Sequence, residues 1–160
     1  MPATAGGQIT LGGGQDTSSP ADDVPDGYAT GNATGNTNGI ILGTIAYVAN
    51  SINVYSGNSG ISMRGQSAYG RGTYITAGSN IVAGDAIWLE GSSSGSTSNY
   101  YHGLAISDAP SPNTSGTIWS SKASGTAISL NSELMKPSSA RRGRLKIPLS
   151  INAVSMAVSL

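Results

Sequence analysis

The chain has 160 residues and a formal net charge of +0 at pH 7, and only 10% of its residues are charged. Soluble domains average roughly 25% charged residues, so this chain offers no global field that would attract nucleic acid or a membrane surface. It contains no Cys, which excludes a disulfide framework. The length fits one domain with extended arms.

Residues 1–39 are dominated by Gly, Thr, Asn, Ala and Asp, and they hold few side chains able to anchor a core. We therefore expect an extended N-terminal arm that becomes ordered by lying on another surface. Ile9 and Leu11 are the apolar side chains of this arm that we expect at an interface. The first five residues lack the basic and apolar regions of a secretory signal, which favours cytoplasmic synthesis.

Residues 40–136 hold clusters of β-branched and aromatic residues separated by Gly, Ser and Asn, a pattern that predicts short strands and tight turns. The strand signals in chain order are Ile40–Val48, Ile52–Val54, Ile61–Arg64, Tyr74–Ile75, Ile81–Val82, Ala86–Glu90, Leu104–Ile106, Thr117–Trp119 and Thr126–Leu130. Ser132–Lys136 predicts one helical turn, which Pro137 ends. We therefore expect an all-β protein, a small β-barrel or sandwich with extended N- and C-terminal arms.

Residues 137–160 are basic at their start and apolar beyond. The apolar positions change from odd to even after Ala153, which indicates a bulge or a new packing partner. Such an edge strand needs cover from a neighbouring subunit or from its own sheet. The basic residues lack interleaved aromatics, so they favour an acidic protein surface over nucleic acid. The predicted interface residues here are Arg141, Arg142, Arg144, Ile147, Leu149, Ile151, Val154, Met156 and Val158.

Gly91–Gly95 matches the G-x-S-x-G pattern of a nucleophile elbow, and His102 is the only histidine. That motif needs a helix directly after the serine, whereas Ser96–Asn99 predicts a loop, so the plain interpretation is a hairpin loop. A hydrolase that uses Ser93 and His102 is therefore disfavoured. One histidine without cysteine does not make a zinc site, and the N-terminal aspartates lack EF-hand spacing. We expect no enzyme activity, no metal and no cofactor.

Three short pieces carry a resemblance to a known family: Ala83–Asp85 followed by the strand Ala86–Leu89, then Gly103–Ala109, then Gly116–Trp119. In this order they resemble the capsid-decoration (cement) proteins of tailed bacteriophages, over roughly residues 72–130. The resemblance implies a small β-barrel that sits on the outside of a capsid as a homotrimer. It also implies the major capsid protein as partner and the virion surface as location.

The sequence therefore predicts a virion structural protein that decorates and stabilises a capsid through multivalent protein contacts, without nucleic acid or membrane as partner. An alternative remains open. The same Gly/Ser/Thr-rich strand composition fits a tail-fibre or receptor-binding module, which would bind a glycan or a cell surface through Tyr100 and Tyr101.

Overall fold

A computed structural model gives the fold, and it describes residues 6–13, 24–31, 38–43, 52–76, 78–94, 102–107, 116–134, 151–152 and 158–159. These residues form strands and turns without a helix. Accordingly, the described part of the chain contains no helix of the length and hydropathy needed to cross a membrane. The strands are β1 (Ile9–Leu11), β2 (Ala29–Gly31), β3 (Ile40–Leu42), β4 (Asn53–Tyr55), β5 (Ile61–Ser67), β6 (Thr73–Thr76), β7 (Asn80–Ala83), β8 (Ile87–Ser93), β9 (Leu104–Ser107), β10 (Thr117–Ser120), β11 (Thr126–Leu134), β12 (Ile151–Asn152) and β13 (Val158–Ser159).

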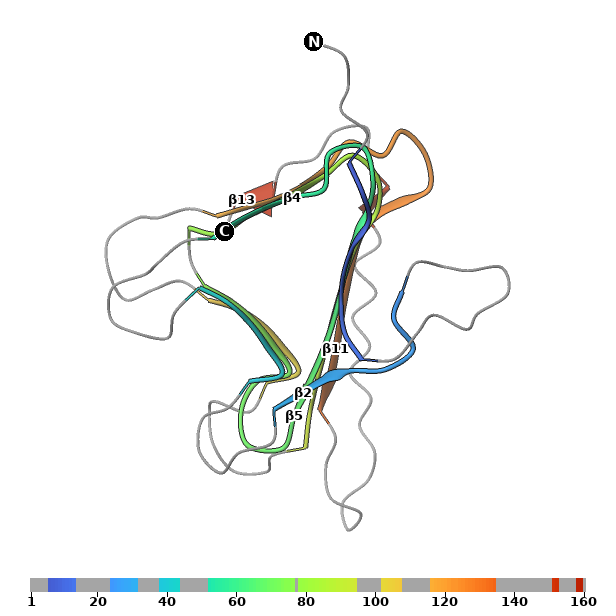
Figure 1. The fold of residues 1–160 in the computed structure, drawn as a ribbon. Helices are drawn as coiled ribbons and strands as arrows, with labels where there is room; N and C mark the ends of the chain where they lie inside the picture. The colour runs from blue at the N-terminus through green and yellow to red at the C-terminus, as the bar shows by residue number, and fades with distance from the viewer. Residues whose placement is uncertain are drawn as a thin grey trace.

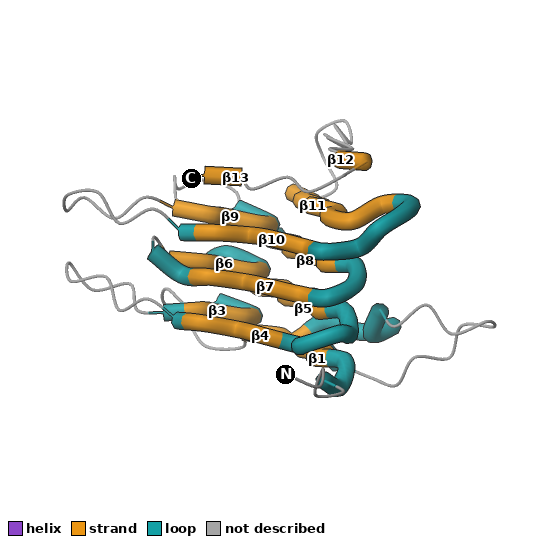
Figure 2. The backbone as a smooth tube through the Cα atoms, turned by 90° about the horizontal axis from the view of Figure 1, so that it is seen from above, coloured by secondary structure: helices purple, strands orange, loops and turns teal. Residues whose placement is uncertain are grey.

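The strands stack into three sheets. A six-stranded sheet has the order β1-β5-β8-β11-β12, with β2 also paired to β5; a four-stranded sheet has the order β13-β10-β7-β4; and a three-stranded sheet has the order β3-β6-β9. The sheets form the sides of a triangle seen along the stacking direction (Figure 1), and a perpendicular view shows their strands as successive rungs (Figure 2). All pairs are parallel except those of β12 and β13. The fold is a three-sided parallel β-helix.

The predicted β-barrel or sandwich is wrong. Each strand from β3 to β8 is followed by two strands in the other sheets before the chain returns to the same sheet, so β5 pairs with β8 and β8 with β11. One full turn of the chain separates paired strands, which makes the pairing parallel. The corners of a β-helix use the same turn residues, Gly, Asn and Ser, as β-hairpins do. The sequence pattern therefore does not distinguish a β-helix from a barrel or sandwich built of hairpins. The predicted helical turn at Ser132 is also wrong, because β11 continues through Leu134.

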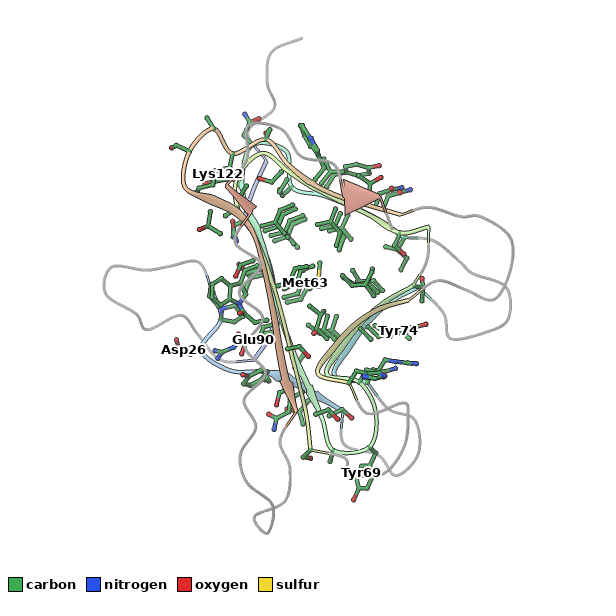
Figure 3. The ribbon with its side chains drawn as sticks, turned by 180° about the vertical axis from the view of Figure 1, so that it is seen from behind. Asp26, Met63, Tyr69, Tyr74, Glu90 and Lys122 are labelled. Carbon is green, nitrogen blue, oxygen red and sulfur yellow. The ribbon has the colours of Figure 1, made fainter. Side chains whose placement is uncertain are left out.

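The interior of the triangle is filled by aliphatic columns that run from rung to rung. Ile9, Ile61, Ile87 and Ile128 are register partners in the six-stranded sheet. Figure 3 shows Met63 among the inward side chains, and it is 0% exposed. Because neighbouring strands lie about 4.8 Å apart, partners in one column touch. Burial of these columns provides the main stabilisation of the fold.

Glycine forms the corner where the six-stranded and three-stranded sheets meet. Gly65 and Gly91 are register partners in β5 and β8. A Cβ added to Gly91 would lie 1.9 Å from the carbonyl oxygen of Gly103, and one added to Gly65 would lie 2.2 Å from that of Gly72. The two backbones therefore approach each other closely enough to leave no room for a side chain at this corner.

The ends of the chain contribute strands to the same β-helix. Within residues 1–39, β1 and β2 both pair with β5, and Gly13 and Gly27 exchange two backbone hydrogen bonds of 3.1 and 2.7 Å. In the tail, β12 pairs antiparallel with β11, whereas β13 pairs antiparallel with β10. The two described parts of the tail therefore pair with different strands, while the residues at which a bulge or a change of packing partner was predicted lie outside the described ranges.

Candidate functional site

Four side chains meet on the outer face of the six-stranded sheet: Tyr28, Arg64, Trp88 and Glu90, which we call the Glu90 cluster. Successive residues of β5 and β8 point alternately inward and outward, and the parallel register places Arg64 beside Glu90. Trp88 lies two residues before Glu90 and so shares its face. Figure 3 shows Glu90 on the outer side of the sheet, away from the aliphatic interior.

The Glu90 carboxylate accepts hydrogen bonds on both oxygens. Arg64 Nε and Trp88 Nε1 donate to Oε2 at 3.0 and 3.2 Å. The Tyr28 hydroxyl donates to Oε1 at 2.5 Å, and Arg64 Nη2 does so at 3.4 Å. The Glu90 side chain is 9% exposed and that of Arg64 23%, so water screens this ion pair less than it screens a surface pair. The arrangement joins three segments of chain through one carboxylate.

Arg64 also holds the segment that leads into β2. Its Nη1 donates to the carbonyl oxygens of Pro25 and Asp26, both at 2.8 Å. Its guanidinium lies over the Tyr28 ring, 4.4 Å from the ring centroid, a distance typical of a cation–π contact. The Glu90 cluster thus fastens residues 24–28 onto the outside of β5 and β8.

The Glu90 cluster predicts a loss of stability at high pH. Burial, followed by the hydrogen bond and charge of Glu90, raises the pKa of Tyr28 from 10.0 to about 12. A raised pKa means that the unfolded chain loses the tyrosine proton first, so the stabilisation is present below pH 10 and is lost as pH rises through 12. We expect the free energy of unfolding to fall between these values in the wild type and to fall less in Tyr28→Phe. Urea unfolding of both proteins at several pH values between 10 and 12 measures this difference. If the free energy of unfolding fell equally steeply with pH in both proteins, the raised pKa of Tyr28 would be contradicted.

A second ion pair joins two turns at the corner between the four-stranded and six-stranded sheets. Lys122 Nζ lies 2.5 Å from Asp85 Oδ1, and this hydrogen bond lowers the pKa of Asp85. The Ser120 hydroxyl donates to the carbonyl oxygen of Asp85 at 2.7 Å. The Asp85 side chain is 52% exposed, so solvent screens the charges and the pair contributes little to stability.

The residues weighed for hydrolase chemistry lie in different settings. Ser93 is buried at the end of β8, where its hydroxyl donates to the carbonyl oxygen of Gly70 at 2.9 Å. His102 is exposed. Gly91–Ser93 belong to β8, so the strand extends into the stretch predicted as a hairpin loop. Among the described residues, no three His, Cys, Asp or Glu side chains come together as a metal site.

A second candidate site is the open end of the β-helix. We call β1 to β4 the first rung; among the strands that the structure describes, each pairs on one side only, with a strand of the next rung. Within the described ranges, four of the five exposed large hydrophobic residues lie in or beside it. These are Leu11 (36% exposed), Ile41 (39%), Ile52 (38%) and Tyr55 (60%). One rung further in, Met63 and Tyr74, the register partners of Leu11 and Ile41, are 0% and 8% exposed.

The predicted interface residues fall in three places. Ile9 and Leu11 lie in β1 on the first rung, where Ile9 packs against the core and Leu11 is exposed. Ile151 lies in β12 and Val158 in β13. The remaining predictions lie outside the described residues: Arg141, Arg142, Arg144, Ile147, Leu149, Val154, Met156, and the Tyr100–Tyr101 pair.

Comparisons with protein-family models, with curated proteins and with solved structures find no match for this chain. The resemblance to capsid-decoration proteins thus rests on the short sequence motifs. The β-barrel that the resemblance implies is not the fold found here, because the motif strands belong to a parallel β-helix.

Proposed function

We propose that the protein is a structural component of a virion, which decorates and stabilises the outer surface of a capsid through several protein contacts per copy. The observation that carries this proposal is the first rung, where exposed apolar side chains coincide with strand edges that no other described strand pairs. Exposed edges pair readily with other chains, and burial of apolar surface contributes roughly 25 cal/mol per Å². Such an end is suited to assembly.

The C-terminal segment supplies a second set of candidate contacts. Residues 137–160 combine a basic cluster with apolar positions, and their described strands, β12 and β13, lie at the opposite end of the β-helix from the first rung (Figure 2). We propose that the basic cluster faces acidic protein on the shell. Assembly through the first rung would join more than one C-terminal segment in the same particle, so attachment to the shell would be multivalent, which raises overall affinity without new contacts at either site.

The basic cluster gives a test of shell binding. We expect the triple variant Arg141→Ala, Arg142→Ala, Arg144→Ala to bind undecorated empty bacteriophage capsids at least tenfold more weakly, about 1.4 kcal/mol. The remaining binding should depend less on salt, because fewer charges are screened. Co-sedimentation over a range of ionic strength measures both effects, with Lys122→Ala as a control that removes a positive charge from a corner turn. Unchanged binding by the triple variant would reject this contact.

The second candidate is a tail-fibre or receptor-binding module, which one feature of the four-stranded sheet favours. Tyr55, Val82 and Trp119 are register partners on its outer face. Beside them Asn80 Nδ2 donates to Asn53 Oδ1 at 2.7 Å. An uncharged face with aromatic and amide groups is suited to stacking and hydrogen bonding with a sugar. Binding to a glycan array without binding to capsids would favour this alternative.

A further inference from the structure

We infer that the first rung is closed by the first rung of a second copy, joined end to end about a twofold axis perpendicular to the β-helix. The inference rests on the proposed function in one respect: it names the partner of the assembly surface described above. Three observations carry it, namely the direction of the outward-facing backbone groups, the form of the two ends, and the absence of charge from the strands of the first rung.

Backbone groups on the first rung face outward at alternate residues. Ile9 N donates to Gly60 O at 3.2 Å, and Ile40 N donates to Gly72 O at 2.9 Å, so these residues bond to the second rung. Successive peptide groups in a strand point to opposite sides. The N–H and C=O groups of Thr10 and Ile41 therefore point away from the second rung, toward the side on which no described strand lies.

The same alternation holds in β4. Ser56 N donates to Val82 O at 3.2 Å, and Asn80 N donates to Ile52 O at 2.9 Å, so the even-numbered residues bond to β7. The peptide groups of Asn53 and Tyr55 consequently point outward. All three sheets thus present donors and acceptors at one end, and such groups reach their lowest free energy when each has a partner.

The form of the two ends selects the partner. At the far end, β12 and β13 pair antiparallel with β11 and β10 and cover two of the three sheets. At the first rung, a partner must match the edges of three sheets arranged as a triangle (Figure 1). A second copy carries the same triangle. The twofold axis reverses the strand direction of the second copy, so the strands of the two first rungs meet antiparallel. At the far end, β12 and β13 already pair antiparallel with their neighbours.

Charge also favours a second copy. In a twofold interface the same surface is present on both sides, so a charged residue meets like charges near the axis. The four strands of the first rung contain no Lys, Arg, Asp or Glu; their sequences are Ile-Thr-Leu, Ala-Thr-Gly, Ile-Ile-Leu and Asn-Val-Tyr. Because the covered far end does not present the same three edges, stacking ends in a closed dimer and does not continue into a fibre.

The test measures the association state of the full chain without capsids, by sedimentation equilibrium. We expect the wild type to form a dimer. Ile41→Lys introduces a charge on the first rung, and Thr10→Pro removes an outward N–H from an edge strand that tolerates proline. Both should weaken dimerisation at least tenfold. Tyr69→Lys is the matched control, since Tyr69 is 44% exposed in the turn after β5, and it should remain a dimer.

Circular dichroism shows whether each variant keeps the β-strand spectrum of the wild type. Because the two variants differ chemically, a folding defect in one of them still leaves the other as a test. A trimer, or a dimer that both variants leave intact, would overturn the inference. A wild-type monomer that binds capsids and loses that binding in Ile41→Lys would also overturn it, while leaving the proposed function in place. A monomer that binds no capsid would reject both.

Discussion

Replacing Gly91 by alanine is expected to destabilise the protein by about 3 kcal/mol, the upper part of the range for overpacked interiors. The added Cβ would lie 1.9 Å from the carbonyl oxygen of Gly103. The obstructing atom is backbone, so no side-chain rotation relieves the clash, and the corner between two sheets must open. Urea unfolding of wild type and variant, followed by circular dichroism, measures the difference in free energy of unfolding.

Gly7→Ala is the control for this prediction. A Cβ added at Gly7 meets no heavy atom within 4 Å, so the free energy of unfolding should stay within about 0.5 kcal/mol of the wild type, as for ordinary surface substitutions. Equal effects of the two substitutions, or a Gly91→Ala protein as stable as the wild type, would contradict the close corner between the six-stranded and three-stranded sheets.

Leu89→Ala is expected to cost about 3 kcal/mol, within the range of 2–5 for a buried leucine. Leu89 is 0% exposed and lies in the middle of an inward column of the six-stranded sheet. Rungs above and below hold it in place, so the structure collapses only partly around the lost atoms, and the remaining cavity adds to the lost transfer free energy. Urea unfolding at a concentration low enough to keep the protein monomeric gives the value.

Leu11→Ala is the matched comparison, because the same chemical change is made in the same column. Leu11 is the register partner of Met63, which is the register partner of Leu89. Leu11 lies on the first rung and is 36% exposed, so its loss should cost about 1 kcal/mol in the monomer, in proportion to its smaller buried area. Equal costs at the two positions would contradict the placement of the first rung at an open end.

Local sequence patterns predicted most strand positions but not the way the strands pair. Ile61–Gly65 and Ile87–Gly91 share an isoleucine, a large apolar residue, a charge and a glycine at matching positions, 26 residues apart. Asn53 and Asn80, 27 residues apart, begin a second repeated pattern. Repeats at this spacing are typical of solenoids. The connections before β9 and β10 are longer than those before β6 and β7, so the third occurrence of each pattern does not follow at the same spacing. A search for individual strands therefore does not reveal the repeat.

The Glu90 cluster was not predicted, because its formation depends on register. Arg64 and Glu90 become neighbours only when β5 and β8 lie parallel with Ile61 beside Ile87, and a shift by one residue would turn one of them inward. Tyr28 reaches the same carboxylate from a segment that shows no strand pattern. Ile9 and Leu11 were predicted at an interface because they are apolar residues in a polar stretch. Their position on the first rung could not be predicted from the sequence, since it depends on the pairing of β1 with β5.

Amide hydrogen exchange of the wild-type protein, measured residue by residue below and above the concentration at which it dimerises, tests the assembly of the first rung most directly. We predict that the amides of Ile9 and Ile40 are protected at both concentrations, because they bond to the second rung. The amides of Thr10, Ile41 and Tyr55 should exchange rapidly in the monomer and become protected in the dimer. Protection of these three amides that does not change with concentration would contradict an end-to-end dimer built on the first rung.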